Sequence, residues 1–201
     1  DGEQKYSPSA QVFIDPNGNV EVLSTHEQIL DETGMTFLGS VFPARKVYRK
    51  EIMEHAFNMG QTLASKGICG MFSADFMVAI NENNVEIFLI EINLRKGGTT
   101  HPYQTAKRVT DSNFDHITGY LMDKSKNKIR YISNDNVVKP SLKNIKIENL
   151  LELAKKANLL FDSKTNSGVI FHMLQAMPEF GKLGYTIIAR SDKKIGLLEK
   201  S

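Results

Sequence analysis

FSADFMV at residues 72–78 and FLIEINLRKGGTTHP at residues 88–102 are the two stretches that decide the fold and the chemistry of this chain. Both begin as runs rich in Phe, Val and Ile, which are typical of β-strands. The polar sequence NENN at residues 81–84 separates the runs. We therefore predict two strands, over residues 71–80 and 85–93, joined as a hairpin.

Each predicted strand has one apolar face, because side chains alternate across a sheet. The positions expected to face the core are Ala74, Phe76, Val78 and Ile80 on the first strand and Phe88, Ile90 and Ile92 on the second. On the other face, Asp75 lies beside Met77, and Glu91 lies beside Asn93. One side of the hairpin is therefore expected to carry two acids and an amide.

The register of the hairpin decides whether these polar groups meet. A loop of three residues, 82–84, predicts the cross-strand pairs Asp75–Glu91, Ser73–Asn93 and Met77–Leu89. A loop one residue shorter or longer would place the two carboxylates on opposite faces. The apolar pattern favours the three-residue loop, since that register puts both apolar sets on the core side.

Two carboxylates that lie directly opposite each other on a sheet repel, unless a cation lies between them. Mg²⁺ is suited to this position, because it takes oxygen ligands and is often bound by one or two carboxylates together with a nucleotide's phosphates. Asn93 would add a neutral oxygen on the same side. The alternative is a pair of acids that are simply solvated on an exposed face.

The same residues resemble a known family. Glu91-Ile92-Asn93, after an acid on the preceding strand, resembles the metal-binding signature of the ATP-grasp superfamily. RKGGTTHP at residues 95–102 is similar to the pheganomycin-type peptide ligases, as are LSTHEQ at 23–28 and GSVFPA at 39–44. GVIFHML at 168–174 resembles the small C-terminal domain of those ligases, so the resemblance extends over nearly the whole chain.

The resemblance implies roles for particular residues. Asp75, Glu91 and Asn93 would bind Mg²⁺ or Mn²⁺, with Glu91 bridging two ions. Met77 matches a position that packs on the adenine of ATP. Ile90 is a second candidate for this contact, although strict alternation turns it toward the core.

The residues after the second strand would contact phosphate. Arg95 would face the transferred phosphate or the acyl phosphate, because a planar guanidinium suits oxyanions. The backbone N–H groups of Gly97 and Gly98 could approach an oxyanion closely, since glycine has no Cβ. Ser73 departs from the pattern, since some ligases of the superfamily carry arginine there, and serine does not supply the oxyanion contact of that guanidinium.

The implied activity is that of a carboxylate–amine ligase. ATP would activate a small-molecule or peptide carboxylate as an acyl phosphate, and an amine would displace the phosphate. In this superfamily a glycine-rich phosphate loop and ATP-binding lysines precede the segment found here, and no such loop occurs in this chain. We therefore expect a missing N-terminal half of the same enzyme, and weak or no binding of Mg·ATP by the isolated chain.

The predicted fold class is α+β, in two parts. Residues 1–122 would form the C-terminal part of an ATP-grasp domain, an antiparallel sheet with packed helices that include one at 47–66. The polar run at 124–128 is a candidate linker, and residues 123–201 would form a small α+β domain. Its predicted elements are a strand at 129–132, a helix at 142–157, strands at 168–174 and 185–189, and a last helix from 193.

Composition excludes several other classes. Lys plus Arg is 25 and Asp plus Glu is 23, so the charge balance does not indicate a nucleic-acid-binding protein. Cys69 is the lone cysteine, so no internal disulfide and no cysteine-based zinc site is expected. No apolar run approaches the roughly 20 residues that span a bilayer, and no signal peptide is visible. We expect a cytoplasmic protein.

Two histidines and two other function classes remain open. His101, beside the glycines, could contact substrate or could cap the next helix, whereas His172 is interpreted as a satisfied core histidine. A non-catalytic binding or regulatory module derived from an ATP-grasp domain is the main alternative function. A hydrolase with Asp75 and Glu91 as an acid–base pair is a third, although the chain has no tryptophan for a sugar platform.

Overall fold

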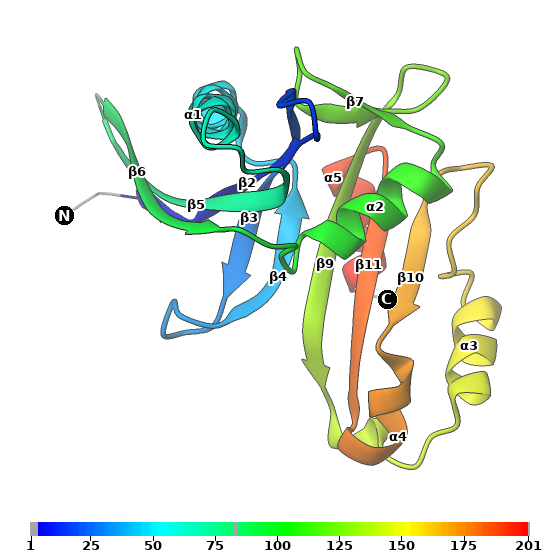
Figure 1. Cartoon of the computed structure of the whole chain (residues 1–201). Coiled ribbons are helices and arrows are strands. Elements are labelled where there is room, and N and C mark those ends of the chain that lie inside the picture. Colours follow the sequence, from blue (N-terminus) through cyan, green and yellow to red (C-terminus); the bar gives the residue numbers. More distant parts are fainter. Residues whose placement is uncertain (1–3, 83, 201) are drawn as a thin grey trace.

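The chain is built around one extended antiparallel sheet, which the computed structural model describes for residues 4–82 and 84–200 (Figure 1). The strands are β1 (Gln4–Tyr6), β2 (Pro8–Ile14), β3 (Val20–Leu30), β4 (Phe37–Phe42), β5 (Gly70–Asn81), β6 (Asn84–Asn93), β7 (Asn113–Asp115), β8 (Tyr120–Met122), β9 (Lys128–Val138), β10 (Gly168–His172) and β11 (Lys182–Ala189). Their order is β1-β5-β2-β3-β4-β9-β11-β10, β6 pairs with β5, and the β7–β8 hairpin lies beside β9. The predicted antiparallel sheet with packed helices is confirmed.

Helices cover both faces of this sheet. They are α1 (Lys46–Ala64), α2 (Thr100–Val109), α3 (Ile147–Lys156), α4 (Met177–Phe180) and α5 (Asp192–Glu199), with short 3-10 turns at Pro140–Leu142 and Leu174–Ala176. None of the described helices combines the length and the apolar character needed to cross a membrane.

Helix α1 covers β2, β3 and β5. Ile52 and Ala56 are fully buried, and Met59 and Leu63 pack against the same core, as the helical spacing predicts. The strands contribute the buried residues Ala10, Val12, Ile14, Val22, Phe72, Ala74, Phe76 and Val78. The helix predicted at 47–66 is therefore confirmed, two residues shorter at its C-terminal end.

Helix α2 covers the opposite face of the sheet, over β4, β9 and β11 (Figure 1). Its Tyr103 packs with Phe42 and Tyr131, whose rings are stacked with centroids 4.9 Å apart. The next layer lies on the other side of β11, where Ile187 packs with Ile195 of α5. The glycine loop that precedes α2 is thus anchored by a buried aromatic cluster.

The sheet runs without interruption across the predicted boundary near residue 122. Residues 39–42 of β4 pair with residues 131–134 of β9. The run at 124–128, expected as a linker, lies in and beside the tight turn between β8 and β9, where the amide of Lys126 donates to the carbonyl of Asp123. The linker prediction is wrong because Asp123 is buried and its carboxylate accepts hydrogen bonds within this turn.

The second half also differs from its predicted element lengths. The strand expected at 129–132 extends over the whole of β9, and the helix expected at 142–157 is the shorter α3. Asn144 has a φ of 63°, a left-handed conformation that interrupts helical geometry between the 3-10 turn and α3.

A buried histidine in the core makes stability depend on pH. His26 Nε2 lies 2.6 Å from the hydroxyl oxygen of Tyr131, and burial lowers the pKa of His26 from 6.5 to about 3. The unfolded chain therefore binds a proton that the folded chain does not. We expect the stabilisation to be complete above pH 6.5 and to fall by about 1.4 kcal/mol per pH unit as pH drops toward 3. Urea unfolding of the parent and of His26→Gln at pH 7 and pH 5 tests this, since the variant should lose that part of the slope.

Candidate metal and phosphate site

The β5–β6 hairpin at the end of the sheet brings the predicted acids together. Asp75 pairs with Glu91, and Ser73 pairs with Asn93, as the sequence predicts. Because paired residues in an antiparallel ladder lie on the same face, the two carboxylates and the amide share one side of the sheet. Asp75 is partly buried and Glu91 is exposed, so the group lies at an open surface.

The hairpin reaches this register in a different way from the one predicted. Asn81 pairs with Asn84, so the connection between the paired residues is one residue shorter than the predicted three-residue loop. The register then shifts at a β-bulge between Asp75 and Phe76, opposite which Ile90 is unpaired. The extra residue restores the Asp75–Glu91 pair, because a bulge moves one strand by one position.

The bulge also corrects the predicted faces of β6. Leu89 pairs with Phe76 and, with Ile87, Ile92 and Phe76, lines an apolar groove against α1. Phe88, expected in the core, instead pairs with Met77 on the side of the acids and is 46% exposed. Ile90, also expected in the core, is 63% exposed.

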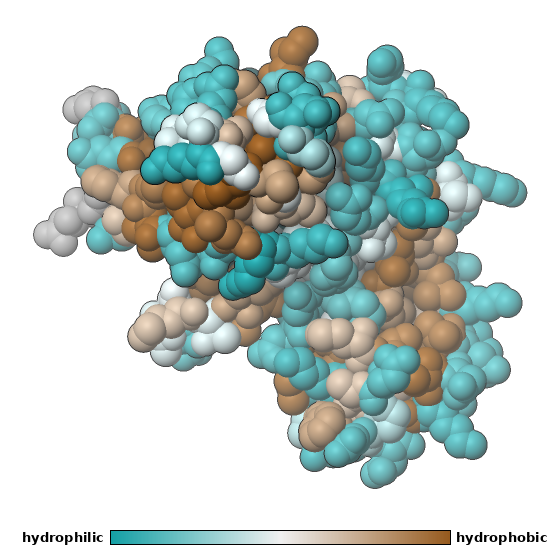
Figure 2. Space-filling model, viewed as in Figure 1, coloured by the Kyte–Doolittle hydropathy of each residue, from teal (hydrophilic) through white to brown (hydrophobic). Residues whose placement is uncertain are grey.

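Apolar surface therefore adjoins the acids. On the other face of the hairpin, Figure 2 shows a hydrophobic area between the β5–β6 hairpin and α1, where the apolar groove lies. Phe88, Ile90 and the partly buried Met77 supply apolar side chains from two adjacent strands. Such a platform beside carboxylates suits a ligand that has a flat apolar part and a charged part.

The electrostatics of the acids favour a cation. Burial and the neighbouring charge of Glu91 raise the pKa of Asp75, while the nearby Arg95 opposes this shift. The Asn93 side-chain nitrogen donates to Asp75 Oδ2 and to Glu91 Oε2, at 3.0 Å in each case. A rotated Asn93 amide would offer its oxygen instead, giving three oxygen donors on one face. This donor set fits a hard divalent ion.

The loop after β6 is held in place by buried polar contacts. Gln11 Nε2 donates to Thr99 Oγ1 over 2.7 Å, and Thr100 Oγ1 donates to Gln11 Oε1 over 3.1 Å. The amide of Gly97 donates to Thr100 Oγ1, so this N–H is engaged within the protein. A Cβ on Gly98 would lie 2.6 Å from the ring of Phe37, which explains the glycine there. The sequence does not predict this role of Gln11.

Arg95 lies directly after β6, where its guanidinium contacts the carbonyl of Lys96 at 3.3 Å. Its positive charge acts on Asp75, as the pKa of that carboxyl shows. The structure therefore groups Arg95 with the acids at one end of the sheet, and the glycine loop follows Arg95 directly.

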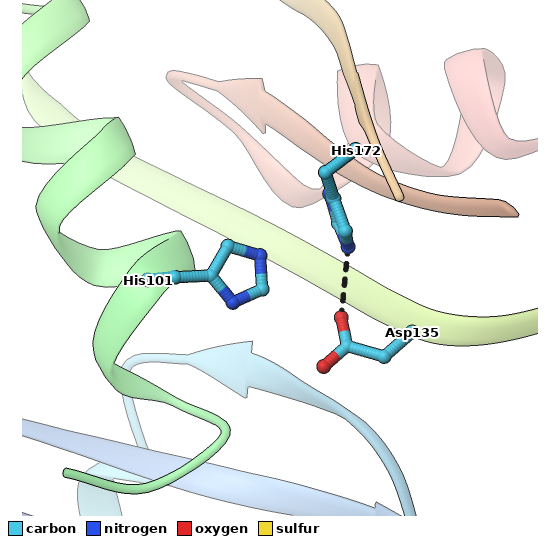
Figure 3. Close-up of side chains that lie close together, drawn as sticks. All are labelled: His101, Asp135 and His172. Atoms are coloured by element: carbon cyan, nitrogen blue, oxygen red, sulfur yellow. Dashed lines mark hydrogen bonds and ion pairs between the residues drawn. The ribbon is translucent and has the colours of Figure 1, made fainter. Parts of the chain in front are cut away.

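A second polar cluster lies beneath the start of α2, and the sequence does not predict it. His172, expected to be a satisfied core histidine, is partly exposed, and its Nε2 lies 2.9 Å from Asp135 Oδ1. His101 faces this pair, with its ring 4.5 Å from that of His172 between centroids (Figure 3). Burial and His172 lower the pKa of His101. No sequence spacing connects these three positions, because pairing of distant strands brings them together.

Comparison with known families identifies the fold. Residues 3–116, more than half of the chain, match the family described as IQCH-like, ATP-grasp. The chain belongs to the ATP-grasp family. Residues 149–194 match the domain described as the PGM1 C-terminal domain. The resemblance to ATP-grasp proteins that was noted from the sequence is confirmed.

Individual relatives agree with this assignment. The ATP-grasp chain is 29% identical over 185 residues to L-propargylglycine–L-glutamate ligase of Streptantibioticus cattleyicolor, covering 92% of this chain and 37% of the relative. It thus spans little more than a third of that relative's length. Solved structures with the same fold include N5-carboxyaminoimidazole ribonucleotide synthetase from Thermus thermophilus (TM-score 0.59, 11% identity, 97% of this chain, 49% of that one). Another is biotin carboxylase from Campylobacter jejuni (TM-score 0.57, 16% identity, 95% and 43%).

Proposed function

We propose that this chain supplies the metal- and phosphate-binding part of an ATP-dependent ligase that joins a carboxylate to an amine. The observation that carries the proposal is the face-to-face pair of Asp75 and Glu91, bridged by Asn93 and open to solvent beside an apolar platform. Membership of the ATP-grasp family and similarity to a relative named as a ligase support it.

Each residue of the site has a role in this proposal. Asp75, Glu91 and Asn93 would hold Mg²⁺ or Mn²⁺, with Glu91 shared between two ions. Bound ions of this kind neutralise charge that develops on the phosphates of ATP. Met77 and Ile90 would pack on the adenine ring, and the exposure of Ile90 at the bulge supports its part.

Phosphate binding is assigned to the segment after β6. Arg95 would hold the transferred phosphoryl group, because its guanidinium already lies close enough to Asp75 to influence the pKa of that carboxyl. The backbone of Gly97 and Gly98 would approach the oxyanion of the acyl group. Since the amide of Gly97 donates to Thr100 in this structure, its use would require that hydrogen bond to be exchanged for one to substrate.

In the proposed reaction, a carboxylate oxygen attacks the terminal phosphorus of ATP and ADP leaves, which gives an acyl phosphate. The amine nitrogen then attacks the acyl carbon, loses a proton and expels inorganic phosphate. Positioning and charge neutralisation would supply most of the catalysis. The printed name of the relative points to amino acids as the first carboxylates and amines to try.

The proposal assigns the two parts of the chain to two domains. Residues 1–122 would form the ATP-grasp part, and residues 123–201 would form the small C-terminal domain, in line with the separate family matches at 3–116 and 149–194. The remaining ATP contacts would come from an N-terminal half of the same enzyme. The 37% coverage of the relative supports this.

Phosphate release tests the proposal. The natural protein that contains this chain is expected to release phosphate only when ATP, a carboxylate and an amine are present together, with L-amino acids as the first panel. The isolated 201-residue chain is expected to bind Mg·ATP weakly or not at all in calorimetry. Release that ignores the amine would contradict a ligase, and ATP binding without any turnover would favour a non-catalytic ATP-grasp module. Micromolar ATP binding by the isolated chain would show that no further half is needed.

A further inference from the structure

His101, Asp135 and His172 form a cluster that the proposed ligase chemistry does not use. His101 lies in the first turn of α2, Asp135 on β9 and His172 at the end of β10 (Figure 3). One nitrogen or oxygen atom from each residue lies within 4.8 Å of the other two. Among the described residues, this is the one group of three that meets this distance criterion with His, Cys, Asp or Glu.

We propose that these three side chains bind one divalent transition-metal ion, with zinc as the ion that they fit best. Two imidazole nitrogens and one carboxylate oxygen form a ligand set that zinc accepts, with a fourth position left for water or a substrate. Mg²⁺ takes oxygen ligands and is suited to the separate Asp75–Glu91 site instead. The chain would then hold two metal sites of different chemical character.

The distances fit such a site after a small movement. Zinc bonds of about 2.0–2.2 Å place tetrahedral ligand atoms about 3.3 Å apart. Asp135 Oδ1 and His172 Nε2 are already 2.9 Å apart. The remaining approach would be made by the His101 side chain, which lies at the protein surface with its ring edge-on to that of His172.

The surroundings orient Asp135 and His172. Ser133 Oγ donates to Asp135 Oδ1 over 3.3 Å. A Cβ at position 184 would lie 2.2 Å from His172 Nε2, so Gly184 keeps β11 clear for that ring. Ligands supported in this way are typical of metal sites, in which outer contacts fix the tautomer and the ring orientation.

The proposal also accounts for the location of the cluster. His101 comes from the loop and helix that follow the ATP-grasp signature, whereas Asp135 and His172 come from strands of the second half. An ion bound there would tie α2 and the glycine loop to β9 and β10. The metal would replace the hydrogen bond between His172 Nε2 and Asp135 Oδ1, because a coordinating ring nitrogen carries no proton.

Cobalt and zinc titrations of the 201-residue chain test this site. We expect one equivalent of Co²⁺ to produce the visible absorption of a tetrahedral site, and one equivalent of Zn²⁺ to displace it. Excess Mg²⁺ should leave the absorption unchanged. His101→Ala and Asp135→Asn should each weaken Zn²⁺ binding by at least about tenfold. Zn²⁺ should also raise the melting temperature of the parent and leave that of His101→Ala unchanged.

His55→Ala is the matched control. His55 is an exposed histidine on α1 that lies 3.7 Å from Glu51, so its loss removes a surface imidazole of the same kind without touching the cluster. Its Zn²⁺ affinity should equal that of the parent. Equal affinities in the parent, His101→Ala and Asp135→Asn would overturn the proposal, as would the lack of saturation below about 100 µM in the parent. Either result would leave His172 and Asp135 as a purely hydrogen-bonded pair.

Discussion

Glu91→Gln is expected to reduce ATP-, carboxylate- and amine-dependent phosphate release by at least about 100- to 1,000-fold. The amide keeps the size of the side chain and removes the charge that faces Asp75 across the hairpin. Under the proposed function that charge binds both ions, so its loss removes electrostatic stabilisation at the point where phosphate charge develops. The measurement is steady-state phosphate release by the full-length protein.

A second readout on the isolated chain separates a lost charge from a lost fold. Glu91 raises the pKa of Asp75, so Glu91→Gln should lower that pKa, which carboxyl chemical shifts can follow. Glu86→Gln is the matched control, because Glu86 lies exposed on the same strand and pairs with Ala79. Turnover that survives Glu91→Gln, or an equal loss in Glu86→Gln, would contradict the assignment of the metal site.

Local patterns were sufficient to predict the hairpin and its acids. The runs of Phe, Val and Ile predict β5 and β6, and the 4-3-4 spacing of apolar residues predicts α1. The pair Asp75–Glu91 is confirmed, but periodicity alone does not explain it. The connection between the strands is one residue shorter than predicted, and the β-bulge shifts the register by one residue in the opposite direction, so the two changes cancel. Strict alternation therefore assigned Phe88 to the wrong face.

Contacts between distant segments could not be predicted in the same way. Asp135 and His172 become neighbours because β9 and β10 both flank β11, and nothing local to either position indicates that order. The pairing of β4 with β9 is another case, since it joins segments about 90 residues apart and makes the two predicted parts share one sheet. A polar run that resembles a linker is, for the same reason, a tight turn.

A substitution where β4 pairs with β9 has the largest expected effect on stability. A Cβ on Gly39 would lie 2.0 Å from the carbonyl oxygen of Ser133 and 2.9 Å from the Cα of Asn134. Both are backbone atoms of β9, so the contact cannot be relieved by turning a side chain. Gly39→Ala should therefore separate the two strands locally and lower the free energy of unfolding by about 3 kcal/mol. Urea denaturation at pH 7 measures this difference.

Gly196→Ala is the control that shows whether the loss of stability comes from the contact between β4 and β9 or from glycine replacement in general. Gly196 lies inside α5, and an added Cβ would meet no atom within 4 Å. Alanine is the better helix former, so this variant should be as stable as the parent or more stable by up to about 1 kcal/mol. Amide exchange in Gly39→Ala should speed up first at residues 39–42 and 131–134, the paired positions. Equal stability of the two variants would mean that β4 and β9 do not pair closely in solution, and the single continuous sheet would then have to be abandoned.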